Sequence, residues 1–149
     1  MTKIYYPYTQ FVSDMQTLVQ KIDKPFDAIL CIARGGLTMG HFLGIHYDTR
    51  DVFAINSISY DDTQKLDEVK IFNIPDLRDA KSVLIVDDIV DSGDTLLEIL
   101  RVLGEQFPSI TFYTASIFYK KSAKISPTWY IHEATQWIEF FWEVDLKEK

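Results

Sequence analysis

The stretch Val83–Thr95, VLIVDDIVDSGDT, gives the strongest indication of the fold of this 149-residue chain. It begins with four apolar residues, as is typical of a strand buried on both faces of a parallel sheet. Two carboxylates, Asp87 and Asp88, follow the apolar run. A helix is expected over 95–103, where leucines recur on one side. This succession of strand, acidic turn and helix predicts one unit of an α/β fold.

The rest of the chain alternates strands and helices in the same way. Further strands are expected at 28–32, 52–58 and 110–118, and further helices at 9–22 and 37–43. The alternation predicts an α/β fold with a mainly parallel central sheet flanked by helices. Gly36, Gly40 and Gly44 fall four residues apart, so one helix face is bare and is expected to pack closely on a neighbour.

Composition predicts one domain spanning residues 1–149. Hydrophobic residues make up 47% of the chain and charged residues 25%, which suits a substantial core. The net charge of -7 argues against a nucleic-acid partner bound through a basic face. A single cysteine, Cys31, excludes an intramolecular disulfide and a zinc site of its own. Because no signal pattern or transmembrane-length apolar run is visible, a cytoplasmic location is expected.

The segment 59–81 is rich in charged residues and has few periodic apolar positions. A connection of this length between strands is either functional or disordered.

The acidic turn after the strand predicts a site for a phosphorylated ribose. Ligands of open parallel sheets bind beyond the carboxyl ends of the strands. A helix N-terminus attracts phosphate, Gly93 allows close approach of the backbone, and the hydroxyls of Ser92 and Thr95 add hydrogen bonds. The carboxylates of Asp87 and Asp88 suit ribose hydroxyls or Mg²⁺. The alternative is an ordinary strand, turn and helix with capping hydroxyls and solvated aspartates.

The whole stretch Val83–Thr95 resembles the phosphoribosyl pyrophosphate signature of the type I phosphoribosyltransferases. The resemblance implies that Asp87 and Asp88 organise the ribose and metal-bound waters. It implies that Ser92, Gly93, Asp94 and Thr95 form the loop around the 5′-phosphate. Asp94 departs from many relatives, which have Gly or Lys there, and its side chain is expected to point to solvent.

Asp91 indicates one subgroup of this family, because the members that act on 6-oxopurines have Asp at this position. The resemblance therefore implies a general acid/base at Asp91 that manages the proton on purine N7. Lys120 resembles the lysine that contacts the 6-oxo group, with Lys121 as the rival by one position. The segment at about 129–145 resembles that of bacterial xanthine–guanine phosphoribosyltransferases. There Trp137 would stack on the base and the Ile138 backbone would contact its 2-substituent.

Three further features fit the same family. Arg34 and Gly35 resemble its pyrophosphate loop, which often has a cis peptide, here Ala33–Arg34. The 59–81 segment resembles its flexible hood, with Ser59–Tyr60 matching a Ser-Tyr pair near the start. Glu143 stands where relatives have Asp, and it could orient a metal-bound water.

The resemblance implies an enzyme of purine salvage that uses Mg²⁺. It would transfer 5-phosphoribosyl from phosphoribosyl pyrophosphate to N9 of guanine, xanthine or hypoxanthine, giving the nucleoside monophosphate and pyrophosphate. The sequence does not rank these purines. The aromatic C-terminal segment suggests a homodimer or homotetramer. Two alternatives are a non-catalytic nucleotide sensor with the same fold and an enzyme with another acceptor; Asp91 and Lys120 argue against adenine or a pyrimidine.

Overall fold

The computed structural model describes residues 2–60 and 68–147. The strands are β1 (Lys3–Tyr6), β2 (Ala28–Ala33), β3 (Val52–Tyr60), β4 (Glu68–Phe72), β5 (Ser82–Val90), β6 (Thr111–Tyr119), β7 (Trp129–Glu133) and β8 (Trp137–Phe140). The helices are α1 (Tyr8–Lys21), α2 (Leu37–His46), α3 (Asp94–Gln106) and α4 (Phe141–Val144). None of these helices has the length and apolar composition needed to span a membrane.

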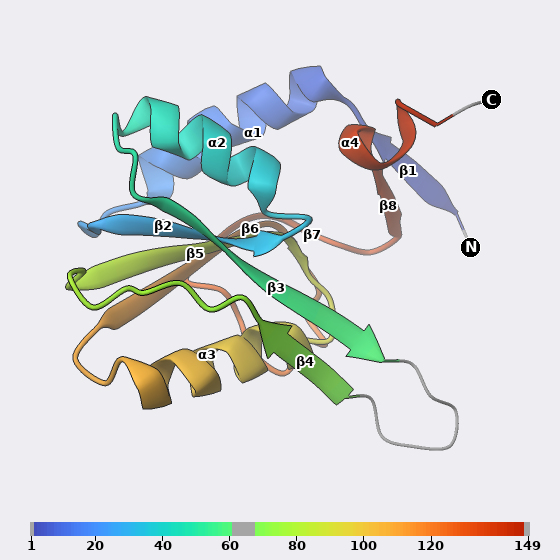
Figure 1. Cartoon of the computed structure of the whole chain (residues 1–149). Helices are drawn as coiled ribbons and strands as arrows, with labels where there is room; N and C mark the ends of the chain where they lie inside the picture. Colours follow the sequence, from blue (N-terminus) through green and yellow to red (C-terminus); the bar gives the residue numbers. More distant parts are fainter. Residues whose placement is uncertain (1, 61–67, 148–149) are drawn as a thin grey trace.

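The central sheet confirms the predicted α/β fold. Within the described ranges its strand order is β4-β3-β2-β5-β6-β7. All neighbours are parallel except β4, which is antiparallel to β3. Helices α1 and α2 cover one face of the sheet and α3 covers the other (Figure 1). The chain leaves β2 through α2 and enters β3 on one side of β2, whereas β5 lies on the other side of β2. In open α/β sheets, ligands bind at the carboxyl ends of the two strands where the direction of the connections reverses. The ligand crevice is therefore expected at the carboxyl ends of β2 and β5.

Strand β5 is longer than the sequence suggested. The apolar run was expected to end at Val86 with the acids after it, but the strand continues to Val90. Beyond the apolar run, Asp87, Ile89 and Val90 still pair with Ser116, Phe118 and Tyr119 of β6. The two acids therefore lie within the strand, and the parallel partner strand holds their backbone in place.

The charged segment 59–81 contains a strand that the sequence analysis missed. Strand β4 pairs with the end of β3 in antiparallel register, from Asn56↔Phe72 to Tyr60↔Glu68. Its side chains alternate between exposed and half-buried, with Val69 and Ile71 on the less exposed side. Residues 61–67 of the expected hood lie outside the described part of the chain.

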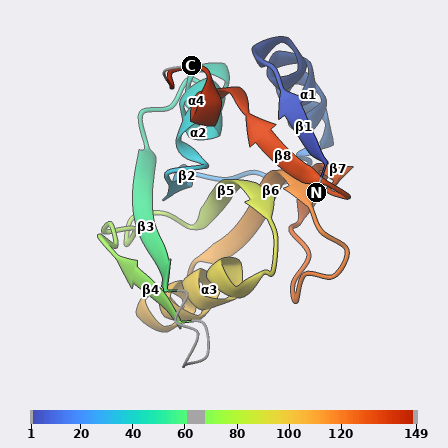
Figure 2. The same ribbon diagram turned by 90° about the vertical axis from the view of Figure 1, so that its right-hand side faces the viewer.

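Strands β1 and β8 form a separate parallel pair that the sequence did not predict. Their register places Ile4 opposite Ile138 and Tyr6 opposite Phe140. Figure 2 shows this pair crossing beside β7, with α4 at the end of β8. The first and last strands of the chain therefore build one structural unit, and it carries the aromatic segment assigned to the purine.

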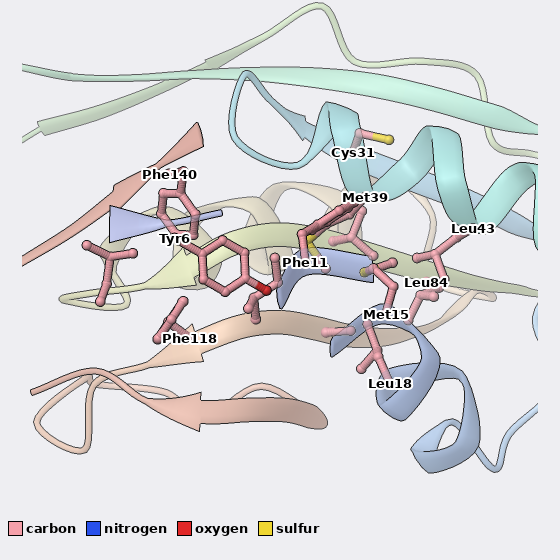
Figure 3. Close-up of a cluster of buried hydrophobic side chains, with 14 of the residues drawn as sticks. Tyr6, Phe11, Met15, Leu18, Cys31, Met39, Leu43, Leu84, Phe118 and Phe140 are labelled. Atoms are coloured by element: carbon pink, nitrogen blue, oxygen red, sulfur yellow. The ribbon is translucent and has the colours of Figure 1, made fainter. Parts of the chain in front are cut away.

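Helix α2 packs closely on the sheet, as the glycine spacing predicted. A Cβ atom at Gly40 would overlap the Sγ atom of Cys31, and one at Gly36 would overlap the carbonyl oxygen of Val86. Burial raises the pKa of the Cys31 thiol to about 11, which agrees with its expected role in strand packing. Figure 3 shows this core, in which Met39 and Leu43 of α2 lie near Cys31.

Candidate active site at the carboxyl ends of the strands

Two adjoining cavities lie at the carboxyl ends of the strands. The smaller, about 90 Å³, is lined by Ser92, Gly93 and Thr95 together with parts of β5 and β6. The larger, about 610 Å³, lies between the end of β5 and strand β8. Ile89 and Asp91 line both cavities. Asp91 is therefore placed between a phosphate-sized hollow and a space large enough for an aromatic base.

The turn around the small cavity has the geometry of an anion site. Gly93 adopts the left-handed backbone conformation, with φ 88°, and α3 begins at the next residue. Ser92 Oγ accepts a hydrogen bond from the backbone N–H of Asp94 at 3.2 Å. A side chain at Gly93 would come within 3.0 Å of the Lys124 backbone nitrogen, so glycine is required by both conformation and space. Thr95 and Leu96 of the first α3 turn line this cavity, and the N–H groups at a helix N-terminus are suited to binding an anion.

The expectation for Asp94 was wrong in one respect. Its side chain does not simply point to solvent, because Asp94 Oδ1 lies 2.5 Å from Lys124 Nζ. The hydrogen bond from this ammonium group lowers the pKa of Asp94. A backbone hydrogen bond from Lys124 N–H to the Ser92 carbonyl, 2.9 Å long, joins the same two segments. Asp94 thus neutralises a nearby lysine and fastens the loop after β6 to the turn.

The acid pair is electrostatically strained. Burial raises the pKa of Asp87 well above its ordinary value, and the charge of Asp88 raises it further. Burial also raises the pKa of Asp88, and the charge of Glu143 adds to that effect. The backbone N–H groups of Asp88 and Ile89 donate to the Asp87 and Asp88 carboxylates at 2.9 and 2.8 Å, which fixes both side chains.

The turn after β2 packs directly against this acid pair. The peptide bond Ala33–Arg34 is cis, as the family resemblance implied. A Cβ atom at Gly35 would lie 2.5 Å from Asp88 Oδ1, so only glycine leaves room for this carboxylate. The Arg34 side chain is exposed to solvent. The two chain segments at the switch point of the sheet therefore meet at Asp88.

The larger cavity brings together the residues assigned to the purine. Lys120, Trp137 and Ile138 all line it. Lys120 Nζ forms an ion pair with Asp91 Oδ1 at 2.8 Å. Lys121 is exposed and is absent from the described lining, which favours Lys120 of the two candidates. The Trp137 side chain is 55% exposed and therefore offers a ring face for stacking.

Glu143 lies at the edge of the larger cavity, on the side of Asp88. The neighbouring Trp142 has a buried indole nitrogen without a hydrogen-bond partner of ordinary geometry among the described residues. Phe141 and Trp142 pack against the core, so they act as core residues here.

The donor set suits a hard cation that keeps most of its own water. Among residues 2–60 and 68–147, no cluster of three or more carboxylate, histidine or cysteine side chains has metal-binding geometry. Mg²⁺ commonly binds through one or two carboxylates, water and substrate phosphates, rather than through a complete protein cage. Asp87 and Asp88, whose raised pKa values reflect unfavourable negative charge, fit this mode of binding.

Several predicted residues do not line either cavity in the described structure. Arg34, Gly35, Asp94 and Ser59 are in this group, and Ser59 lies exposed near the end of β3. The sequence analysis in turn missed some lining residues. They are Ile89, Ala134, Thr135, Gln136 and Phe140, with Thr114, Ala115 and Pro127 around the smaller cavity. Ile89 lies inside the signature motif, and residues 134–136 and Phe140 lie inside the segment at about 129–145 that resembles the family's base-binding segment, whereas the three residues around the smaller cavity carried no signal.

The fold and the site define an α/β protein that binds a phosphorylated ribose beside a planar base. Comparison with known proteins agrees: the family model described as "phosphoribosyl transferase domain" matches residues 2–149. The chain belongs to the phosphoribosyltransferase family.

Similar proteins point in one direction within that family. The xanthine-guanine phosphoribosyltransferase of Gluconobacter oxydans is 35% identical over 133 residues, which cover 85% of this chain and 74% of the relative. The solved structure of the Helicobacter pylori xanthine-guanine-hypoxanthine phosphoribosyltransferase has a TM-score of 0.90 and 44% identity, covering 97% of this chain and 96% of that one. A purine phosphoribosyltransferase from Pyrococcus horikoshii has a TM-score of 0.84 and 28% identity, with each chain fully covered at 100%.

Proposed function

We propose that this protein transfers the 5-phosphoribosyl group from phosphoribosyl pyrophosphate to N9 of a 6-oxopurine. The products are the purine nucleoside monophosphate and pyrophosphate, as in purine salvage. The observation that carries the proposal is the position of Asp91 in the wall common to both cavities. The names of the bacterial relatives, which act on xanthine, guanine or hypoxanthine, support the same substrates.

Each part of the site has a role in this reaction. The turn Ser92–Thr95 holds the 5′-phosphate, and Asp87 and Asp88 hold the ribose hydroxyls. Arg34 and Gly35 contact the pyrophosphate. Binding both substrates in one geometry removes much of the entropic barrier, and fixed charges stabilise the transition state.

The base is held in the larger cavity. Trp137 stacks on the purine, the backbone of Ile138 faces its 2-substituent, and Lys120 donates to the 6-oxo group. As N9 bonds to C1′ of the ribose and the bond to pyrophosphate breaks, Asp91 accepts the proton from purine N7. Lys120 and Asp91 form an ion pair with each other in the free protein. An incoming 6-oxopurine takes the place of this ion pair, because its 6-oxo group binds Lys120 and its N7 binds Asp91.

Mg²⁺ is the expected cofactor. Asp87 and Asp88 would hold it through water and substrate oxygens, with Glu143 near one side. When bound, the ion would neutralise the pyrophosphate and this acid pair. The hood, including Ser59 and Tyr60, would exclude water from the activated ribose. We further propose a cytoplasmic homodimer or homotetramer; the exposed Ile45 on α2 is consistent with such an interface.

The test is an assay with phosphoribosyl pyrophosphate, Mg²⁺ and each of guanine, xanthine, hypoxanthine and adenine. Nucleotide is expected with one or more 6-oxopurines. Asp91→Asn is expected to lower kcat by about 10²- to 10⁴-fold, the usual contribution of a general acid/base, with little change in KM for phosphoribosyl pyrophosphate. Tight nucleotide binding without turnover would instead indicate a sensor, and an unchanged rate in the variant would remove Asp91 from its assigned role.

A further inference from the structure

A buried carboxylate outside the two cavities joins three elements of the fold. Asp14 is only 7% exposed, on the inner face of α1. Its Oδ2 atom accepts a hydrogen bond from the Tyr6 hydroxyl at 2.5 Å, and the same oxygen lies 2.9 Å from Nε2 of His132. In the tautomer of His132 that carries its proton on Nε2, this ring nitrogen donates to the same oxygen. Asp14 thus connects α1 to β1 through Tyr6 and to β7 through His132.

Tyr6 transmits this connection to the wall of the larger cavity. It is the last residue of β1 and lies opposite Phe140 in the β1–β8 register. Its ring packs edge-on against Phe118 and Phe140, with centroids 5.3 and 5.5 Å apart. Figure 3 shows the Tyr6 ring between these two phenylalanines. Phe140 in turn lines the larger cavity, so one side chain separates the Asp14 carboxylate from the purine wall.

The wall depends on such a connection because β8 does not belong to the central sheet. Its hydrogen-bonded neighbour in the described structure is β1. Asp91 and Lys120, in contrast, follow β5 and β6 of the central sheet. The distance between the two sides of the purine cavity is therefore set by how the β1–β8 pair is fastened to the rest of the protein.

We propose that Asp14 is a positioning residue for the purine: through Tyr6 and His132 it fixes the β1–β8 pair, and with it Trp137 and Ile138, at the correct distance from Asp91 and Lys120. This inference rests on the proposed function. Burial and the hydrogen bond to Asp14 raise the pKa of Tyr6, so the phenol keeps its proton and remains the donor. The turn assigned to the 5′-phosphate lines the smaller cavity instead, and the described lining of that cavity includes no residue of β1 or β8.

The proposal predicts a selective effect on the base. Asp14→Asn keeps the shape of the side chain and one acceptor oxygen but removes the charge. Tyr6→Phe removes a single oxygen atom and is the milder change. Both are expected to raise KM for the purine by about tenfold, less than the hundredfold that a misplacement of about 1 Å can cause. KM for phosphoribosyl pyrophosphate should stay within about twofold, and the double variant should show less than the sum of the two single effects, since both changes act on the Tyr6–Asp14 hydrogen bond.

The control for general destabilisation is Ile99→Val. Ile99 is fully buried on α3 in the other core, away from β1 and β8. Ile99→Val should lower the free energy of unfolding without changing KM for the purine. Asp14 would have a purely structural role if its variants raised KM equally for the purine and for phosphoribosyl pyrophosphate. The same conclusion would follow if Ile99→Val also raised KM for the purine. If Asp14→Asn does not fold, Tyr6→Phe alone decides the question. An inactive wild-type protein would contradict the proposed function, whereas an active one with unchanged purine KM in the variants would overturn this inference only.

Discussion

Replacing Asp87 by asparagine should make the protein more stable and less active. The carboxylate lies beside Asp88, and burial together with that charge raises its pKa. Two full charges about 4 Å apart repel each other by about 4 kcal/mol at an effective dielectric constant near 20. At a pH below this raised pKa, the native protein avoids the repulsion by keeping a proton. The amide oxygen of the asparagine introduced by Asp87→Asn can still accept the 2.9 Å hydrogen bond from the Asp88 N–H group. We therefore expect a net gain of about 1–2 kcal/mol at pH 8.

The sign of the pH dependence follows from the raised pKa. Below the ordinary carboxyl pKa, wild type and Asp87→Asn have the same charge at this position. As pH rises through the higher native-state pKa of Asp87, the wild type loses the stability that came from holding the extra proton. The variant has no such loss. The difference in the free energy of unfolding should therefore be small near pH 4 and largest near pH 8.

Urea unfolding at pH 4, 6 and 8 with a chelator present measures this difference. For a chain of this size, 1–2 kcal/mol corresponds to a rise in Tm of about 2–8 °C. Asp23→Asn is the matched control, because Asp23 is exposed in the connection between α1 and β2. Its effect should be near zero at every pH. A variant at position 87 that is less stable than wild type at pH 8, or a difference that does not grow with pH, would contradict the assignment of strain to the acid pair.

Two other predictions concern packing and purine contact. Gly40→Ala should lower the free energy of unfolding by about 1–3 kcal/mol through overpacking, because the added Cβ atom would overlap Cys31 Sγ. In urea unfolding, the double variant with Cys31→Ala should recover most of that loss. The control Gly104→Ala should not lower the free energy of unfolding, because nothing lies within 4 Å of its added Cβ atom. Lys120→Gln should raise KM for the 6-oxopurine by about tenfold, the value of one lost charge-assisted hydrogen bond, whereas Lys121→Gln should leave it unchanged; equal effects at both positions would contradict the choice of Lys120.

The central sheet could be predicted because its strands and helices carry local signals. Purely apolar runs at 28–32 and 83–86 indicate strands buried on both faces, and the structure has strands there. The end of β5 could not be predicted in the same way. Asp87 and Asp88 interrupt the apolar run, and only the pairing with β6, a contact between segments about 30 residues apart, keeps them in the strand.

The β1–β8 pair had no local signal of comparable strength. Strands of four residues are too short to show a periodic pattern, and their pairing joins the two ends of the chain. The aromatic residues of β8 were noticed, but the sequence does not show which segment supports them. For the same reason the sequence does not show that His132 and Asp14, 118 residues apart, lie in contact.

The site residues show the same difference between local sequence signals and contacts between distant segments. Those within one continuous motif, from Asp87 to Thr95, could be assigned together because a strand and a helix N-terminus fix their relative positions. Asp94 shows the limit of this approach: it was expected to point to solvent, but its partner Lys124, 30 residues away, neutralises its charge.

The position of the acid pair within a strand also bears on how the site works. Side chains on a flexible loop could move apart and relieve their repulsion, but the β6 pairing and the Gly35 contact leave Asp87 and Asp88 little freedom to do so. The free energy stored in their proximity is therefore available to any ligand that brings positive charge or hydroxyl donors to them. The gain in stability and the loss of activity expected for Asp87→Asn therefore have the same origin, and a variant that showed one effect without the other would contradict this explanation.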